Sequence, residues 1–147
     1  MSYVTNTEIT NWMGSATVIQ LTDDTGSGSA NADRITEARQ GAEGEANSYL
    51  ATRYATPVSL TGESEVVAVL RTFVLDLAAY RLHGRKPPIP ADVVRRREEA
   101  IEWLARVASG LVQLPAVAAP AVPTSLGMLA DASGGERMMT RDSLEQV

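Results

Sequence analysis

The sequence contains no cysteine, which excludes disulfides, thiolate nucleophiles and cysteine-ligated metal sites. Aromatic residues make up 5% of the 147 residues, so we expect a core built from Val, Leu, Ile and Ala. Positive charge is also in deficit, since the net charge is −5. A protein whose main task is binding nucleic acid usually carries a basic excess, because it must neutralise phosphates. DNA binding as the main task is therefore not expected.

Long apolar runs and histidines are equally scarce. The longest apolar stretch, 66–82, is interrupted by Arg71, Asp76 and Arg81, which predicts a buried helix and no membrane span. The first residues lack the basic and apolar regions of a secretory signal. The single histidine, His83, has no nucleophile or second metal ligand at motif spacing. We therefore expect no enzyme and no cofactor, metal or small-molecule site; an enzymatic alternative would need a site at His83 or Asp76.

Hydrophobic periodicity predicts an all-α fold, a small bundle of three substantial helices. Apolar residues recur at three- and four-residue steps in 31–54, 64–83 and 90–109, and Gly84 and Gly110 are placed to end the last two. The residues expected to be buried are Ile35, Ala38, Ala42, Ala46, Tyr49 and Leu50, then Val66, Val67, Leu70, Phe73, Val74, Leu77 and Tyr80, then Val94, Ile101, Leu104 and Ala108.

One or two short helices are expected before this bundle. Thr5 and Glu8 have the spacing of a capping box, in which each residue satisfies a backbone amide of the other. Gly14 is placed to end the helix that they begin, and a second short helix is expected over 15–21.

The composition changes after residue 112. The segment 114–123 is rich in Pro, Ala and Val, and 131–136 is rich in Gly, Ser and acidic residues. Such a stretch cannot build a core of its own. We therefore divide the chain into a helical body, 1–112, and an extended C-terminal arm, 113–147, that interacts with other subunits.

Two features of charge call for an interpretation. Asp76 lies inside an apolar helix, where a carboxylate is costly unless it is paired, so a structural partner is expected, with Arg53 as the first candidate. A cluster of basic residues is either self-paired, with Arg95 four residues before Glu99, or faces an acidic partner or DNA. Its members are Arg71, Arg81, Arg85, Lys86, Arg95, Arg96 and Arg97.

The segment 46–58, Ala-Asn-Ser-Tyr-Leu-Ala-Thr-Arg-Tyr-Ala-Thr-Pro-Val, resembles the Tyr-Leu-x-x-Arg-Tyr-x-x-Pro signature of a Mu-like prophage family of head-tail connector proteins. Three further segments resemble the family in the same order along the chain. They are Leu-Thr-Asp at 21–23, the helix 70–82 with Asp76 and Tyr80 inside it, and the Arg-rich helix 93–104 that ends in Trp-Leu. We expect structural roles for Tyr49, Arg53, Tyr54, Pro57 and Asp76.

The C-terminal arm resembles the same family. The segment 137–144, Arg-Met-Met-Thr-Arg-Asp-Ser-Leu, is similar to the family's tail, although Met139 stands where an aromatic residue is common. We expect contacts between subunits at Arg137, Met138, Met139, Arg141 and Leu144, because apolar anchors fill pockets and arginines pair with carboxylates. Arg95, Arg96 and Arg97 are second candidates, facing the portal or the DNA channel.

The resemblance implies a structural part of a virion. It implies a ring of copies of this chain, twelvefold in such connectors, in the neck between capsid and tail, after synthesis in the host's cytoplasm. Its partners would be the portal protein, a tail-side head-closure or terminator protein, and DNA passing through the channel. The first alternative is that the chain is itself a head-closure or tail-terminator protein. The second, of another class, is a regulatory module that binds one non-virion protein.

Overall fold

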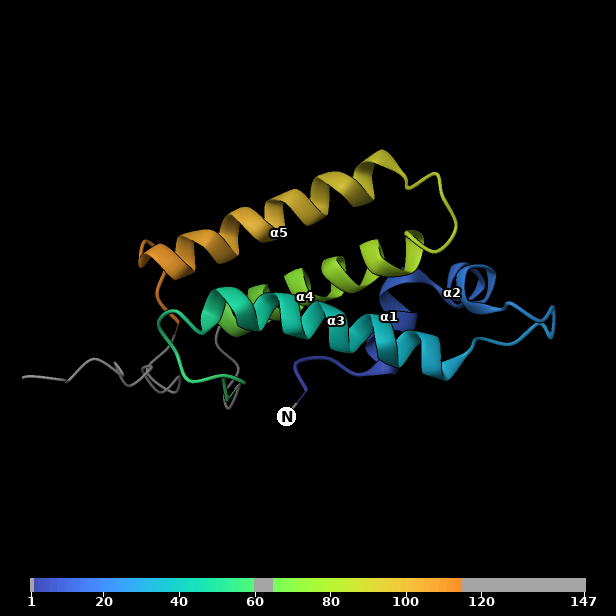
Figure 1. The fold of residues 1–147 in the computed structure, drawn as a ribbon, viewed down its shortest axis with the longest axis horizontal. Helices are drawn as coiled ribbons and strands as arrows, with labels where there is room; N and C mark the ends of the chain where they lie inside the picture. Colours follow the sequence, from blue (N-terminus) through green and yellow to red (C-terminus); the bar gives the residue numbers. More distant parts are fainter. Residues whose placement is uncertain (1, 60–64, 115–147) are drawn as a thin grey trace, which may run out of the picture.

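The computed structural model describes residues 2–59 and 65–114 (Figure 1). Over these residues the fold is all-α, which confirms the prediction. Five helices follow one another: α1 (Asn6–Met13), α2 (Ser15–Thr22), α3 (Ala32–Leu50), α4 (Glu65–His83) and α5 (Ala91–Ser109). The three long ones are the substantial helices expected from the periodicity, and the two short ones precede them.

Helix α4 lies at the centre of the bundle. It contacts α1, α2, α3 and α5, and Figure 1 shows α5 along one side of it and α3 along the other. The chain turns from α4 into α5 at one end of the body and leaves α5 at the opposite end. Among the described residues, no helix is long and apolar enough to cross a membrane.

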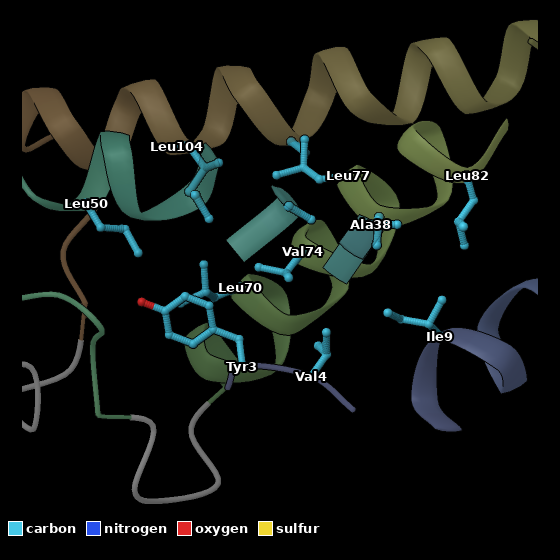
Figure 2. Packing of buried hydrophobic residues seen from close by; sticks show 14 of the residues in the cluster. Tyr3, Val4, Ile9, Ala38, Leu50, Leu70, Val74, Leu77, Leu82 and Leu104 are labelled. Atoms are coloured by element: carbon cyan, nitrogen blue, oxygen red, sulfur yellow. The ribbon is translucent and has the colours of Figure 1, made fainter. Parts of the chain in front are cut away.

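The core fills the space between the three long helices. Leu70, Val74 and Leu77 of α4 are almost completely buried, as are Leu50 of α3 and Leu104 of α5 (Figure 2). Each such side chain contributes about 1.5–3 kcal/mol of hydrophobic free energy when it is removed from water. The expected core of small aliphatic residues is therefore present, and Ala42, Ala46, Ala78 and Ala100 let the helices approach closely.

The beginning of α1 confirms the predicted capping box. The Glu8 backbone N–H donates to the Thr5 hydroxyl at 3.2 Å, and the Thr5 N–H donates to the Glu8 carboxylate at 2.6 Å. The Thr5 N–H and, at 2.8 Å, the Thr5 hydroxyl donate to the Glu8 carboxylate and lower the pKa of this carboxyl, because they favour its charged form. Gly14 ends the helix with φ of 86°, a conformation that favours glycine.

Two helix boundaries and one buried face differ from the expectation. Helix α3 ends at Leu50 and not at 54, because the next residues form tight turns in which Arg53 and Tyr54 both donate their N–H to Leu50 O. Helix α5 begins at Ala91, with Pro90 as its cap. It buries Val93 and Val107 where Val94 and Ala108 were expected.

The segment before α1 is tied to α3. Tyr3 and Val4 are buried, and the Glu43 carboxylate accepts hydrogen bonds from the Ser2 hydroxyl and the Tyr3 N–H. The Tyr3 hydroxyl donates to Asn47 Oδ1 at 2.5 Å. This short segment is therefore part of the body and not a free end.

The described chain ends against the body as well. Leu114 is buried, and its N–H donates to the Tyr54 hydroxyl at 3.0 Å. The interaction residues expected in the arm, Arg137, Met138, Met139, Arg141 and Leu144, lie outside the described residues. The division of the chain at 112 and 113 stays a prediction.

Candidate functional site

The expected basic cluster is largely paired within the chain. Arg95 pairs with Glu99 at 2.5 Å, as predicted from their spacing, and Arg96 lies 3.5 Å from Asp92. Arg85 pairs with Asp24 at 2.6 Å. These contacts favour the self-paired interpretation of the cluster. They join side chains that are mostly exposed, and each contributes less than about 1 kcal/mol to stability.

Arg97 belongs to a more enclosed arrangement that joins the three long helices. The Glu45 carboxylate of α3 pairs with Arg81 of α4 and with Arg97 of α5, each at 3.0 Å. The Arg97 guanidinium also lies 4.6 Å from the centre of the Tyr80 ring, a cation–π geometry. The Glu45 side chain is 18% exposed, so its two ion pairs are partly shielded from water. Arg97 is therefore committed to the body.

Asp76 has a partner, but not the one expected. Its Oδ1 accepts a hydrogen bond from Trp12 Nε1 of α1 at 3.2 Å. Arg53 is not the partner, because it lies beyond the C-terminal end of α3, where its guanidinium packs over Gly110. Burial raises the pKa of the Asp76 carboxyl, while the Trp12 hydrogen bond and the nearby Arg96 charge partly oppose this rise.

Trp12 also forms the edge of a pocket of about 280 Å³. Four helices and the turn before α5 build its wall. The lining residues are Trp12 and Met13 from α1, Thr17 from α2, Ala79 and His83 from α4, and Pro90, Asp92, Val93 and Arg96. We call this hollow the Trp12 pocket.

The Trp12 pocket combines apolar walls with a few charges. Trp12 is 44% exposed, and Met13 and Val93 add apolar surface beside it. Burial lowers the pKa of the His83 imidazole, which favours its neutral form, while nearby Asp92 opposes this shift. An exposed tryptophan beside an arginine and a methionine is typical of the positions that dominate binding energy in protein interfaces.

A second pocket, of about 380 Å³, lies on the other side of α4, between α3 and the end of α4. It is lined by Arg34, Arg81 and Arg85 together with Glu37. Each of these arginines has a carboxylate partner in the body, so the pocket presents balanced charge. Its lining residues include no aromatic side chain, whereas the Trp12 pocket has Trp12 at its edge.

The signature residues in the last turn of α3 and in the loop after it have structural positions. Tyr49 packs against the core, and the Tyr54 hydroxyl accepts the Leu114 N–H. Pro57 follows a cis peptide bond and leads into Val58, which is buried. These residues hold the loop after α3 and the end of the described chain together.

Sequence reasoning missed two of the residues that organise this surface. Nothing in the sequence indicated that Trp12 reaches Asp76, 64 residues away, and stays half exposed. No local sequence pattern indicated the ion pairs of Glu45, because its two partners are 36 and 52 residues away in the sequence. Within the described residues no group of three or more His, Asp or Glu side chains could hold a metal ion.

Comparison with known proteins identifies the family. No curated protein sequence matches the chain. A family model described as Bacteriophage Mu, Gp36 matches residues 3–131, which include all five helices and extend past the described body. The match covers well over half of the chain, so this protein belongs to the bacteriophage Mu Gp36 family.

Proposed function

We propose that this protein is a structural subunit of a phage particle, a connector that joins the DNA-filled capsid to the tail. Copies of the chain form a ring in the neck of the virion, beneath the portal protein and above a tail-side protein. Membership in the bacteriophage Mu Gp36 family carries the proposal, because it ties the chain to a phage.

The architecture of the body supports this role. A connector must keep its shape under the forces that neighbouring subunits exert on it. The ion pairs of Glu45 with Arg81 and Arg97 join α3, α4 and α5, and the Tyr3 contacts fasten the N-terminal segment to α3. The Trp12 pocket supplies a surface on which another subunit could dock.

The arginines expected to face DNA give that contact little support. Arg95, Arg96 and Arg97 each have a carboxylate within 4 Å in the body, and the chain as a whole is acidic. Protein partners therefore come before DNA in the proposal. DNA in the channel stays an expectation from the resemblance alone.

Three alternatives make different predictions. A head-closure or tail-terminator protein would also sit in the neck, but on the tail side, without touching the portal. A regulatory module would bind a non-virion protein and would be absent from purified particles. An enzyme centred on His83 or Asp76 would lose its activity in the His83→Ala or Asp76→Asn variant, and intact particle assembly with both variants would contradict that alternative.

The test is a phage that lacks this gene. We expect DNA-filled heads without tails, or heads that leak DNA, in negative-stain images of the lysate. Quantitative proteomics of wild-type particles should find the chain at about one ring per particle. Complementation with the wild-type gene should restore tailed particles, which controls for effects on neighbouring genes. Complete, infectious particles without the protein would contradict the proposal and favour the regulatory module.

A further inference from the structure

The Trp12 pocket has the chemistry of a receptor for an amphipathic peptide. Trp12, Met13, Pro90 and Val93 provide apolar walls for one or two long, flexible side chains. The hollow is open to the surface beside α5, and Trp12 remains 44% exposed at its edge. A body this poor in aromatic residues would be expected to bury both of its tryptophans rather than leave Trp12 half exposed. An occupant would cover it.

The charges around the pocket favour a basic occupant. Asp92 lies on the pocket wall beside Arg96, at 3.5 Å, and the buried Asp76 carboxylate lies close by, where it accepts the Trp12 Nε1 hydrogen bond. Arg95 does not change this balance, because it pairs with Glu99. A guanidinium that entered the pocket could pair with Asp92 and stack on the exposed face of Trp12. The occupant that fits this pocket therefore carries a cation next to flexible apolar side chains.

One segment of the chain outside the described body has this chemistry. Residues 137–141 read Arg-Met-Met-Thr-Arg, so that one arginine precedes the two methionines and one follows them after Thr140. Methionine adapts its shape to irregular apolar hollows and makes favourable contacts with aromatic rings.

The segment also lies within reach of a neighbouring copy. The described chain ends at Leu114, beyond the C-terminal end of α5, and 23 residues further on comes Arg137. A chain of that length can span up to about 75 Å when extended. Helix α5 separates Leu114 from the Trp12 pocket of the same copy by about 28 Å, its length at 1.5 Å per residue. The segment is long enough to reach the Trp12 pocket of its own copy or that of a neighbouring copy, so an experiment must decide which of the two it occupies.

We propose that the Trp12 pocket of one copy binds residues 137–141 of a second copy. This inference rests on the proposed ring, in which each subunit has a neighbour. Met138 and Met139 enter the apolar hollow beside Trp12, and Arg141 pairs with Asp92. The arm of each subunit thereby fastens it to the next.

The absence of native cysteine allows a direct test. The double variant Thr17→Cys, Thr140→Cys places one thiol in the pocket and one inside the arm segment, and leaves Arg137, Met138, Met139 and Arg141 in place. Purified particles that carry this variant are oxidised and run on a non-reducing gel. The matched control is Ser48→Cys, Thr140→Cys, since Ser48 is exposed on α3 away from the pocket.

We expect a ladder of covalent dimers and larger species for the pocket pair, at least about tenfold stronger than for the control pair. A fast-migrating monomer, which is the mark of a bond within one chain, would overturn the second copy as occupant. Particles that contain the protein but yield no ladder would overturn the inference and leave the ring standing. Absence of the protein from particles would overturn the proposed function itself.

Charge reversal gives a second test that does not depend on the tryptophan. In the pocket-pair background, Asp92→Lys and Arg141→Asp should each weaken the ladder, and together they should restore it. Asp92 and its partner Arg96 are both largely exposed on α5, so these changes leave the core intact. If the ladder is weak in both single variants and stays weak in the double variant, the pairing of Asp92 with Arg141 is contradicted.

Discussion

The phenolic oxygen of Tyr3 accepts a hydrogen bond from the backbone N–H of Val58 at 2.9 Å. Tyr3 precedes α1, whereas Val58 lies in the loop that follows α3, so a single side chain joins two segments 55 residues apart. Both residues are buried (Figure 2 shows the Tyr3 ring within the core). Burial raises the pKa of the Tyr3 hydroxyl and so keeps it a donor for Asn47.

Replacing Tyr3 by Phe should destabilise the protein by about 1–3 kcal/mol, because the buried Val58 N–H would lose its acceptor. Urea unfolding followed by circular dichroism measures the change. Tyr49→Phe is the matched control, since no hydrogen bond of the Tyr49 hydroxyl is found in the described part of the chain, and it should change stability little. Equal effects of the two variants would contradict this role for the Tyr3 hydroxyl.

Glu45→Gln should lower the free energy of unfolding by about 1 kcal/mol or less, since the ion pairs that it removes are partly exposed. The difference between Glu45→Gln and the wild-type protein should shrink as salt is added, because ions screen the wild-type pairs. Thermal unfolding at low and high salt measures both effects. Glu99→Gln, which removes an exposed pair within α5, is the control and should be nearly silent.

Two glycine substitutions should have opposite effects. Gly44 lies within α3 with nothing within 4 Å of an added Cβ, so Gly44→Ala should stabilise the protein by about 0.5–1 kcal/mol. Gly110 has φ of 85°, and a Cβ there would collide with the Arg53 guanidinium. Gly110→Ala should therefore destabilise by about 1–2 kcal/mol. A shift of both melting temperatures in the same direction would disprove this reading of the two sites.

Asp76→Asn tests the buried carboxylate. Burial raises its folded pKa above the unfolded value, so the charged form penalises the folded state at pH above the ordinary Asp pKa. Asn keeps an acceptor for Trp12 Nε1 and carries no charge. The variant should be at least as stable as the wild-type protein at pH 7.

As the pH falls through the folded pKa of Asp76 toward the ordinary Asp value, the wild-type protein should recover stability relative to Asp76→Asn. Urea unfolding at several pH values between 7 and 4 measures this convergence. Asp76→Ala is the second variant, and it should be less stable than Asp76→Asn because Trp12 Nε1 loses its acceptor. A constant difference between Asp76→Asn and wild type at every pH would count against a raised pKa.

The helices were predictable because their signals are local. The capping box at Thr5 and Glu8 and the glycine at Gly110 act within a few residues, and the structure confirms both. Leu104 of α5 is buried as predicted, but Val93 is buried in place of Val94, because helix packing, and not periodicity alone, selects which of two adjacent valines is buried.

The candidate site was less accessible to sequence reasoning. Its parts come from α1, α2, α4 and α5, and nothing local says that Trp12 will meet Asp76, 64 residues later. Arg53 was chosen as the partner of Asp76 on charge alone. The structure uses a neutral indole donor instead, and Arg96, whose charge acts on Asp76, pairs with Asp92. Partner choice of this kind depends on tertiary geometry.

The position of Leu114 makes the two ends of the molecule different from each other. The described chain ends pinned to Tyr54 beyond one end of α5, while the Trp12 pocket opens near the other end. A protomer that offers its arm at one pole and a receptor at the opposite pole forms heterologous contacts. Such contacts either close into a ring or propagate as an open filament, and the rotation between successive copies decides between them.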